Sequence, residues 1–165
     1  MVIKDLEEIK RISKRNEDRN GRFRSYLKMQ DDKEIDCLVK PIYQFIIKRI
    51  NCLECGNCCR NLSPSIVNRD IKNLGLELGL TNNEIIEKYT VKDEFNELRL
   101  KEIPCAFLKG NECLIYQNRP EDCKSFPHIH KKGFTFRLIG MIENSMICPI
   151  VFNVFEELKI QLRYR

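Results

Sequence analysis

Apolar residues recur at helical spacing in three stretches of the chain. Residues 2–18 are predicted to form an amphipathic helix. Residues 34–50 are predicted to form a buried helix, in which Pro41 is tolerated only near a first turn or as a kink. A third helix is predicted near the end of the chain, over residues 151–162. The positions that carry these predictions are Val2, Leu6, Ile9 and Ile12, then Ile35, Leu38, Val39, Ile42, Phe45, Ile46 and Ile50, and finally Val151, Phe155, Leu158 and Leu162.

Two shorter helices are predicted between these stretches. One runs from Asn68 to near Gly79, where glycine suits the end of a helix. The other begins after Thr81 and ends near Tyr89, because Thr81 and Glu84 have the spacing of a capping box. Residues 19–33 are polar and predict a linker instead.

The remaining signals favour short strands. Residues 96–117 are predicted to form strands and turns, with a hairpin at Lys109-Gly110-Asn111 between two apolar runs. The alternation from Gly133 to Ile142 predicts one more strand. The whole pattern predicts an α+β fold: a small, mostly helical single domain with a short β-hairpin or sheet. Within it, residues 1–33 would be an N-terminal helix and polar linker, and residues 34–165 would form the main part of the domain.

Composition limits the environment and the partners. The chain has 165 residues, 32% of them charged, with a net charge of +5. No apolar run approaches the roughly 20 residues that span a bilayer, and the first residues predict neither a signal nor a transit peptide. The nine cysteines are therefore expected in the reducing cytoplasm, and their odd number argues against a complete set of disulfides. The mild positive charge accompanies no nucleic-acid-binding motif, which argues against a nucleic-acid partner.

Four cysteines lie within eight residues, in a C-x2-C-x2-C-C run. They are Cys52, Cys55, Cys58 and Cys59. Two-residue spacers turn successive sulfurs toward one point, which is how a loop binds a soft metal ion or an iron–sulfur cluster. Gly56 suits a tight ligand loop because glycine tolerates positive φ. The run therefore predicts metal binding, and residues 34–165 are predicted to be a cysteine-cluster metal-binding domain.

Four further cysteines raise the number of candidate ligands to eight, enough for two four-thiolate sites. They are Cys105, Cys113, Cys123 and Cys148. Cys37 is left over and is interpreted as a small buried side chain. Neighbouring residues of an extended segment point to opposite sides. One of Cys58 and Cys59 is therefore expected to share a site with Cys52 and Cys55, while the other faces a second site or the core.

The expected cofactor is an iron–sulfur cluster, with [4Fe–4S] considered first, or zinc. The C-x2-C-x2-C spacing is that of bacterial ferredoxins, whose remaining motif cysteine precedes proline, as Cys148 does here. Structural zinc usually uses two C-x2-C pairs, and only the first half of that pattern is present. The spacing favours iron–sulfur, but both metals accept tetrahedral sulfur sites and both remain open.

Four other side chains near the later cysteines are candidates. His128 or His130 could complete a Cys3His site, although exposed strand histidines are the preferred interpretation. Arg119 could offset the charge of several thiolates, and Tyr116 accompanies it between Cys113 and Cys123. Arg119 and Tyr116 are therefore assigned as cofactor-binding residues. No phosphate-binding loop, nucleophile elbow or paired metal-ligand histidine motif appears.

The chain resembles the CxxCxxCC family of small cysteine-cluster proteins from about Asn51 to Pro149. The resemblance rests on the following series, in this order: Cys52-Leu53-Glu54-Cys55-Gly56-Asn57-Cys58-Cys59-Arg60, the Asp70-Ile71 helix, Leu78-Gly79-Leu80-Thr81, Cys105-Ala106-Phe107-Leu108, Gly110, Cys113-Leu114-Ile115-Tyr116, Arg119-Pro120, Cys123 and Phe126-Pro127. Ala106 stands where the family has proline, which affects a turn more than ligation. The first 50 residues match no family pattern.

The resemblance implies zinc or iron chelation, or iron–sulfur oxidoreductase activity by electron transfer. A related cysteine cluster in flagellin lysine N-methylases implies an alternative, an S-adenosylmethionine-dependent protein methylase. Those enzymes are longer, and this sequence has no recognisable methyl-donor motif. The expected function is therefore a cytoplasmic metal-binding protein of unknown specific role. A third, non-enzymatic possibility is a metal-stabilised interaction module that uses the basic N-terminal helix to bind an unknown protein partner.

Overall fold

The computed structural model describes residues 2–164 and divides the chain into two compact units. One unit, here called the helical unit, combines Met1–Asn51 with Pro127–Arg165. The other, here called the cysteine unit, is the continuous segment Cys52–Phe126. The helical unit is therefore assembled from two segments that are far apart in the sequence.

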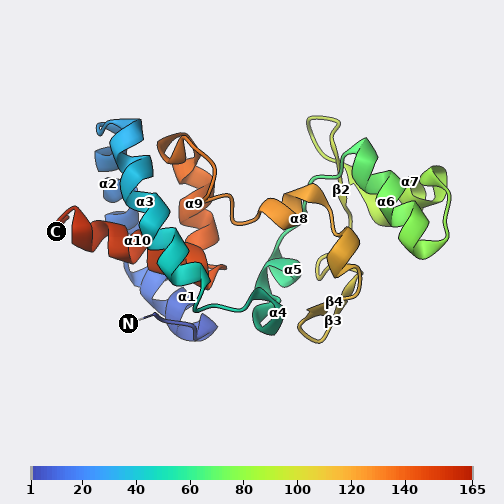
Figure 1. Ribbon diagram of the computed structural model, residues 1–165, viewed down its shortest axis with the longest axis horizontal. Coiled ribbons are helices and arrows are strands. Elements are labelled where there is room, and N and C mark those ends of the chain that lie inside the picture. The colour runs from blue at the N-terminus through green and yellow to red at the C-terminus, as the bar shows by residue number, and fades with distance from the viewer. Residues whose placement is uncertain (1, 165) are drawn as a thin grey trace. The chain divides into compact units, whose positions relative to one another are not determined.

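The helical unit consists of helices that pack side by side (Figure 1). Its longest C-terminal helix, α10, contacts α1, α3 and α9, and α2 contacts α1 and α9. The ring of Phe155 on α10 lies against Phe23 and Phe134, with centroid distances of 6.1 and 5.8 Å. The elements are α1 (Leu6–Arg15), α2 (Glu17–Lys28), α3 (Asp32–Ile47), the 3-10 helix η2 (Phe134–Arg137), α9 (Leu138–Ser145) and α10 (Pro149–Gln161).

Local chemistry explains where these helices begin. The Asp5 carboxylate accepts a hydrogen bond from Glu8 N at 2.7 Å, and Asp31 accepts from Lys33 N and Glu34 N. Both are N-cap bonds, which satisfy backbone donors that have no intrahelical partner. Pro149 occupies the first turn of α10, where its missing N–H costs nothing. The three long helices predicted from apolar spacing are thereby confirmed, and α3 continues through Pro41.

Two of the secondary-structure elements predicted for the helical unit are wrong. Residues 17–28 form a helix instead of a linker, because Asn20, Phe23 and Leu27 bury one face of an otherwise polar segment. Residues 134–145 form η2 and α9 instead of a strand. The buried side chains of α9 are Leu138, Met141 and Ser145, at intervals of three and four, so helical packing outweighed the weak alternation.

Cys37 is exposed, which corrects its interpretation as a buried side chain. The buried residues of α3 are Ile35, Val39, Ile42 and Ile46. Cys37 lies two residues from both Ile35 and Val39, which places it on the opposite side of the helix.

The cysteine unit combines short helices with two antiparallel two-stranded sheets. β1 pairs with β2, placing Val91 opposite Arg99, and β3 pairs with β4, placing Leu108 opposite Cys113. The helices α6 and α7 pack together, and α7 leads directly into β1 (Figure 1). The elements are α4 (Cys52–Cys55), α5 (Asn57–Asn61), α6 (Asn68–Leu78), α7 (Asn82–Tyr89), β1 (Thr90–Lys92), β2 (Leu98–Leu100), β3 (Leu108–Lys109), β4 (Glu112–Cys113), the 3-10 helix η1 (Tyr116–Asn118) and α8 (Glu121–Ser125).

Several sequence signals in this unit are confirmed. The helix α6 ends at Gly79, whose φ is +66°. Thr81 and Glu84 form the capping box of α7: Thr81 Oγ1 accepts from Glu84 N, and Glu84 Oε2 accepts from Thr81 N. The hairpin lies at Lys109-Gly110-Asn111, as predicted. Helices together with two small sheets agree with the α+β class, and a fold organised around a metal remains a prediction.

The cysteine unit has a small apolar core, against which Cys105 and Cys113 pack. Small domains with small cores generally need disulfides or metal for stability. The buried core residues are Ile66, Ile71, Leu74, Ile85, Leu100, Phe107 and Ile115.

Within residues 2–164, no helix has the length and apolar character needed to cross a bilayer.

Candidate metal centre

Seven of the nine cysteines belong to the cysteine unit, and no disulfide joins cysteines in the described residues 2–164. Cys37 and Cys148 belong to the helical unit, where Cys148 is buried just before α10. A shared site that includes Cys148 therefore remains a prediction. The seven are Cys52, Cys55, Cys58, Cys59, Cys105, Cys113 and Cys123.

The C-x2-C-x2-C-C run forms two helical turns, α4 and α5, joined at Gly56 with a φ of +57°. Cys58 and Cys59 both lie in α5, and their Sγ atoms are 3.9 Å apart. The prediction that an extended backbone would point them to opposite sides is therefore wrong. A tetrahedral ion with zinc–sulfur bonds of about 2.3 Å separates its sulfurs by about 3.8 Å, so this pair is spaced as two ligands of one ion.

Cys59 is close enough to four other cysteines of the unit to affect their ionisation. The pKa of Cys52, Cys105, Cys113 and Cys123 is raised mainly by burial, and the charge of Cys59 adds to the rise in each case. Its carbonyl oxygen also accepts a hydrogen bond from Cys105 N at 2.8 Å. Cys59 therefore joins the C-x2-C-x2-C-C run to the later cysteines.

The thiols of the cysteine unit differ in pKa because their surroundings differ. Burial is the main reason why the pKa of Cys123 is raised to about 12, and burial also raises the pKa of Cys105 and Cys113. Burial of its sulfur also raises the pKa of Cys52, although the residue as a whole is exposed. Cys59 differs: a hydrogen bond with the Cys58 thiol, followed by the charge of Arg60, lowers its pKa to about 7. At neutral pH, Cys59 is thus the thiol best prepared to bind a metal.

Cys123 lies on α8, whose start is fixed by carboxylates. Asp70, buried at the beginning of α6, accepts hydrogen bonds from both Val67 N and Glu121 N at 3.1 Å. Asp122 accepts from Ser65 N at 3.0 Å. Sequence analysis missed this role of Asp70, although an acidic residue in the first turn of a helix was a usable signal.

Arg119 and Tyr116 interact within and next to η1. The guanidinium lies 3.8 Å from the centre of the Tyr116 ring and also donates a hydrogen bond to the Tyr116 carbonyl. Its positive charge opposes the rise in the pKa of Cys52 and Cys113. Arg119 thus lies where a positive charge offsets thiolates, and direct cofactor binding by either residue remains a prediction.

The two histidines belong to the helical unit and lie in a turn instead of a strand. His128 has a positive φ of 62°, and the exposed His130 ring lies 6.3 Å from the Tyr43 ring. Across residues 2–164, no three Cys, His, Asp or Glu side chains form a ready-made ligand group for one metal ion. The cysteine unit thus gathers thiols of the chemistry that suits zinc or iron, and coordination requires their side chains to converge further.

Residues 51–142 match the CxxCxxCC family, described as "Putative zinc- or iron-chelating domain". The match covers more than half of the chain, and the chain belongs to this family. The family description is consistent with metal binding by the cysteine unit. No curated protein and no solved structure gave a significant match.

Proposed function

We propose that the cysteine unit binds zinc or an iron–sulfur cluster through its thiolates, and that this binding stabilises the fold of the unit. The observation that carries the proposal is the gathering of seven thiols between residues 52 and 126, with Cys59 electrostatically coupled to four of them. The small apolar core of the unit supports a stabilising role for the metal.

Two observations favour different metals. The separation of 3.9 Å between Cys58 Sγ and Cys59 Sγ favours two thiolates on one metal ion, as in a zinc site. The C-x2-C-x2-C spacing of Cys52, Cys55 and Cys58 favours a [4Fe–4S] cluster, which four cysteines hold in ferredoxins. When bound, zinc would supply metal–thiolate bonds alone, whereas a cluster would also carry electrons.

The residues of this chain have defined tasks in such a centre. The thiols give up their protons on binding, which is easiest for Cys59 and hardest for the buried Cys123. Arg119 offsets part of the accumulated negative charge near Cys52 and Cys113. The apolar residues that pack against Cys105 and Cys113 exclude water from one side.

Anaerobic purification followed by metal and acid-labile sulfide analysis tests the proposal. Stoichiometric zinc without sulfide supports the zinc site, and iron with equimolar sulfide supports the cluster. Folded protein without metal, in which all nine thiols react with a thiol reagent, would refute both.

Single Cys→Ser variants then identify the ligands. Replacing Cys55, Cys59 or Cys113 should lower the metal content, because each lost thiolate removes a metal–sulfur bond. Cys37→Ser is the matched control, since Cys37 is exposed in the other unit and should retain the wild-type metal content.

A further inference from the structure

The turn of the β3–β4 hairpin is tied to the C-x2-C-x2-C-C run by two side chains. Arg60 Nη1 donates to Cys55 O at 3.1 Å, and Arg60 Nη2 donates to Gly110 O at 2.7 Å and to Asn111 Oδ1 at 2.5 Å. Asn111 Nδ2 donates in turn to Glu54 O at 2.8 Å. These four hydrogen bonds are here called the Arg60–Asn111 clasp. Three of them connect residues that are 50 to 57 positions apart, and the fourth joins Arg60 to Cys55 within the same segment.

The backbone at Gly56 shows how closely the two segments approach. A Cβ atom at this position would lie 2.9 Å from Asn111 O and 3.0 Å from Arg60 Nη1. Gly56 is buried and has a φ of +57°, a conformation that other residues rarely adopt. The backbones of the cysteine run and the hairpin therefore approach closely, so their contact does not depend on the Arg60 and Asn111 side chains alone.

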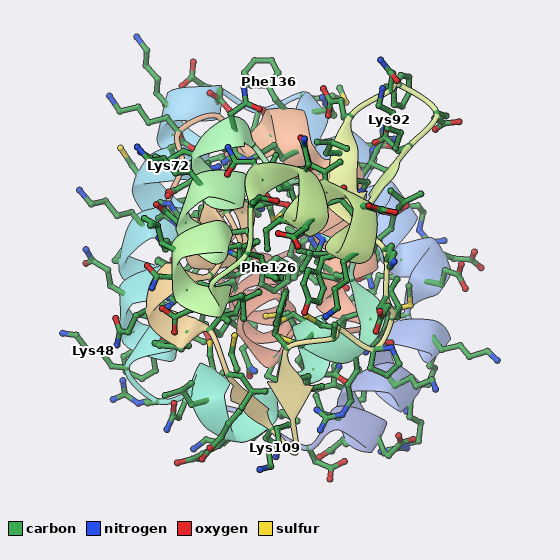
Figure 2. The ribbon with its side chains drawn as sticks, turned by 90° about the vertical axis from the view of Figure 1, so that its right-hand side faces the viewer. Lys48, Lys72, Lys92, Lys109, Phe126 and Phe136 are labelled. Atoms are coloured by element: carbon green, nitrogen blue, oxygen red, sulfur yellow. The ribbon has the colours of Figure 1, made fainter. Side chains whose placement is uncertain are left out.

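The clasp lies between candidate ligands on both segments. Arg60 directly follows Cys59, and Asn111 is two residues before Cys113. The three acceptors of Arg60 are uncharged oxygens, so their hydrogen bonds fix its direction without neutralising its charge. Lys109, at the end of β3, is exposed and lies at the lower edge of the view in Figure 2. The turn therefore reaches solvent at Lys109 and contacts the cysteine run through Asn111.

We propose that Arg60 and Asn111 are positioning residues for the metal centre, and that they hold the cysteine run and the hairpin at the separation that lets Cys55, Cys59 and Cys113 reach the same centre. This inference rests on the proposed metal-binding function. Neither residue ligates the metal. Their contribution is preorganisation, because orientation of ligands by surrounding hydrogen bonds typically raises metal affinity about 10–100-fold.

Chelator competition with zinc as the probe tests the inference. Arg60→Gln and Asn111→Ala should each raise the zinc dissociation constant about 10–100-fold. The double variant should lose little more than either single variant, because the two side chains act as one unit. Asn111→Asp is a milder variant that keeps the acceptor for Arg60 and loses the donor to Glu54 O, and it should give an intermediate loss.

The matched controls are Arg22→Gln and Asn83→Ala. Arg22 is exposed on α2 of the helical unit, and Asn83 is exposed on α7. Both should bind zinc within about twofold of wild type, since exposed polar substitutions seldom change a distant site.

Hydrogen exchange of the metal-free protein distinguishes a local positioning role of the clasp from a contribution to the overall stability of the unit. In metal-free protein, hydrogen exchange of the amides over residues 52–61 and 110–113 should be faster in Arg60→Gln, while that of α6 stays at the wild-type rate. Exchange that rises equally throughout the unit would assign the clasp to overall stability and overturn the positioning role.

Zinc binding by the wild type and by the clasp variants tests the proposed function and the clasp separately. Wild-type protein that binds neither zinc nor iron would overturn the proposed function and the clasp with it. Wild-type protein that binds zinc, with clasp variants that bind it equally tightly, would leave the function intact and overturn the clasp alone.

Discussion

The Cys58 and Cys59 sulfurs lie 3.9 Å apart in a single turn of α5. A helical turn rotates adjacent residues by about 100°, so neighbours can share one centre when their side chains lean together. The same contact lowers the pKa of Cys59 to about 7, because the Cys58 thiol donates a hydrogen bond that favours the Cys59 thiolate. The pair thus combines ligand spacing with a sulfur whose pKa is lowered to near neutrality.

Cys59 is expected to be the most reactive thiol of the metal-free protein. Its pKa of about 7 lies below the ordinary value of 9.0, so its alkylation rate should rise with pH and level off above about pH 7. Iodoacetamide labelling from pH 5 to 10, resolved by mass spectrometry, measures this profile. Cys58→Ala should move the midpoint to higher pH because it removes the main cause of the shift. An unchanged midpoint would contradict the assigned hydrogen bond.

Zinc affinity is expected to rise with pH. Each coordinating thiol releases its proton on binding, so affinity increases with pH as long as that thiol is protonated in the metal-free protein. Cys123, with a pKa of about 12, should contribute one released proton across pH 6–9, whereas Cys59 should contribute little above its pKa of about 7. Competition titrations at several pH values measure the slope. If Cys123 is a ligand, Cys123→Ser should reduce the slope by about one proton.

Gly56→Ala is expected to destabilise the cysteine unit more than Gly79→Ala does. Both glycines have positive φ, which costs a residue with a Cβ about 1–2 kcal/mol. Only at Gly56 would the new Cβ meet backbone, 2.9 Å from Asn111 O, whereas Gly79 has open space. The free energy of unfolding in urea should therefore fall by at least about 1 kcal/mol more for Gly56→Ala. Equal losses would show that the hairpin can move aside.

Asp70→Ala is expected to cost about 2–4 kcal/mol of unfolding free energy, because it leaves Val67 N and Glu121 N without their acceptor. Thr81→Ala, which removes an exposed helix cap, is the reference and should cost about 1 kcal/mol. Urea denaturation monitored by circular dichroism compares the two. A smaller effect for Asp70→Ala than for Thr81→Ala would show that α8 does not depend on this carboxylate.

Periodic and capping signals predicted the longer elements. The apolar spacing of α1, α3 and α10, the Thr81–Glu84 box and the glycine at the end of α6 all act within a few residues, so the sequence displays them directly. The wrong predictions concern segments whose structure depends on contacts with residues that are distant in the sequence. The polar segment of α2 is a helix because Phe23 and Leu27 find partners in the helical unit, which no local pattern contains.

The candidate ligands could be selected from spacing alone, but their geometry could not. The turns α4 and α5 are too short for a periodic apolar signal, so an extended backbone was the available expectation for Cys58 and Cys59. The roles of Arg60 and Asn111 depend on a contact across about fifty residues. The boundaries of the two units likewise follow from the packing of α10 on α3, whereas a separable segment at residues 1–33 remains a prediction.

The unequal distribution of cysteines and apolar residues between the two units affects how the chain would respond to metal supply. A unit stabilised by a bound ligand gains about 1.4 kcal/mol for each tenfold rise in free ligand above the dissociation constant. With zinc or iron bound at residues 52–126, the unfolding free energy of the cysteine unit would rise with the logarithm of the free metal concentration. The core of the helical unit is built from apolar side chains such as Phe23, Phe134 and Phe155, and its folding would be insensitive to that concentration. A chelator would then unfold the cysteine unit and leave the helical unit folded.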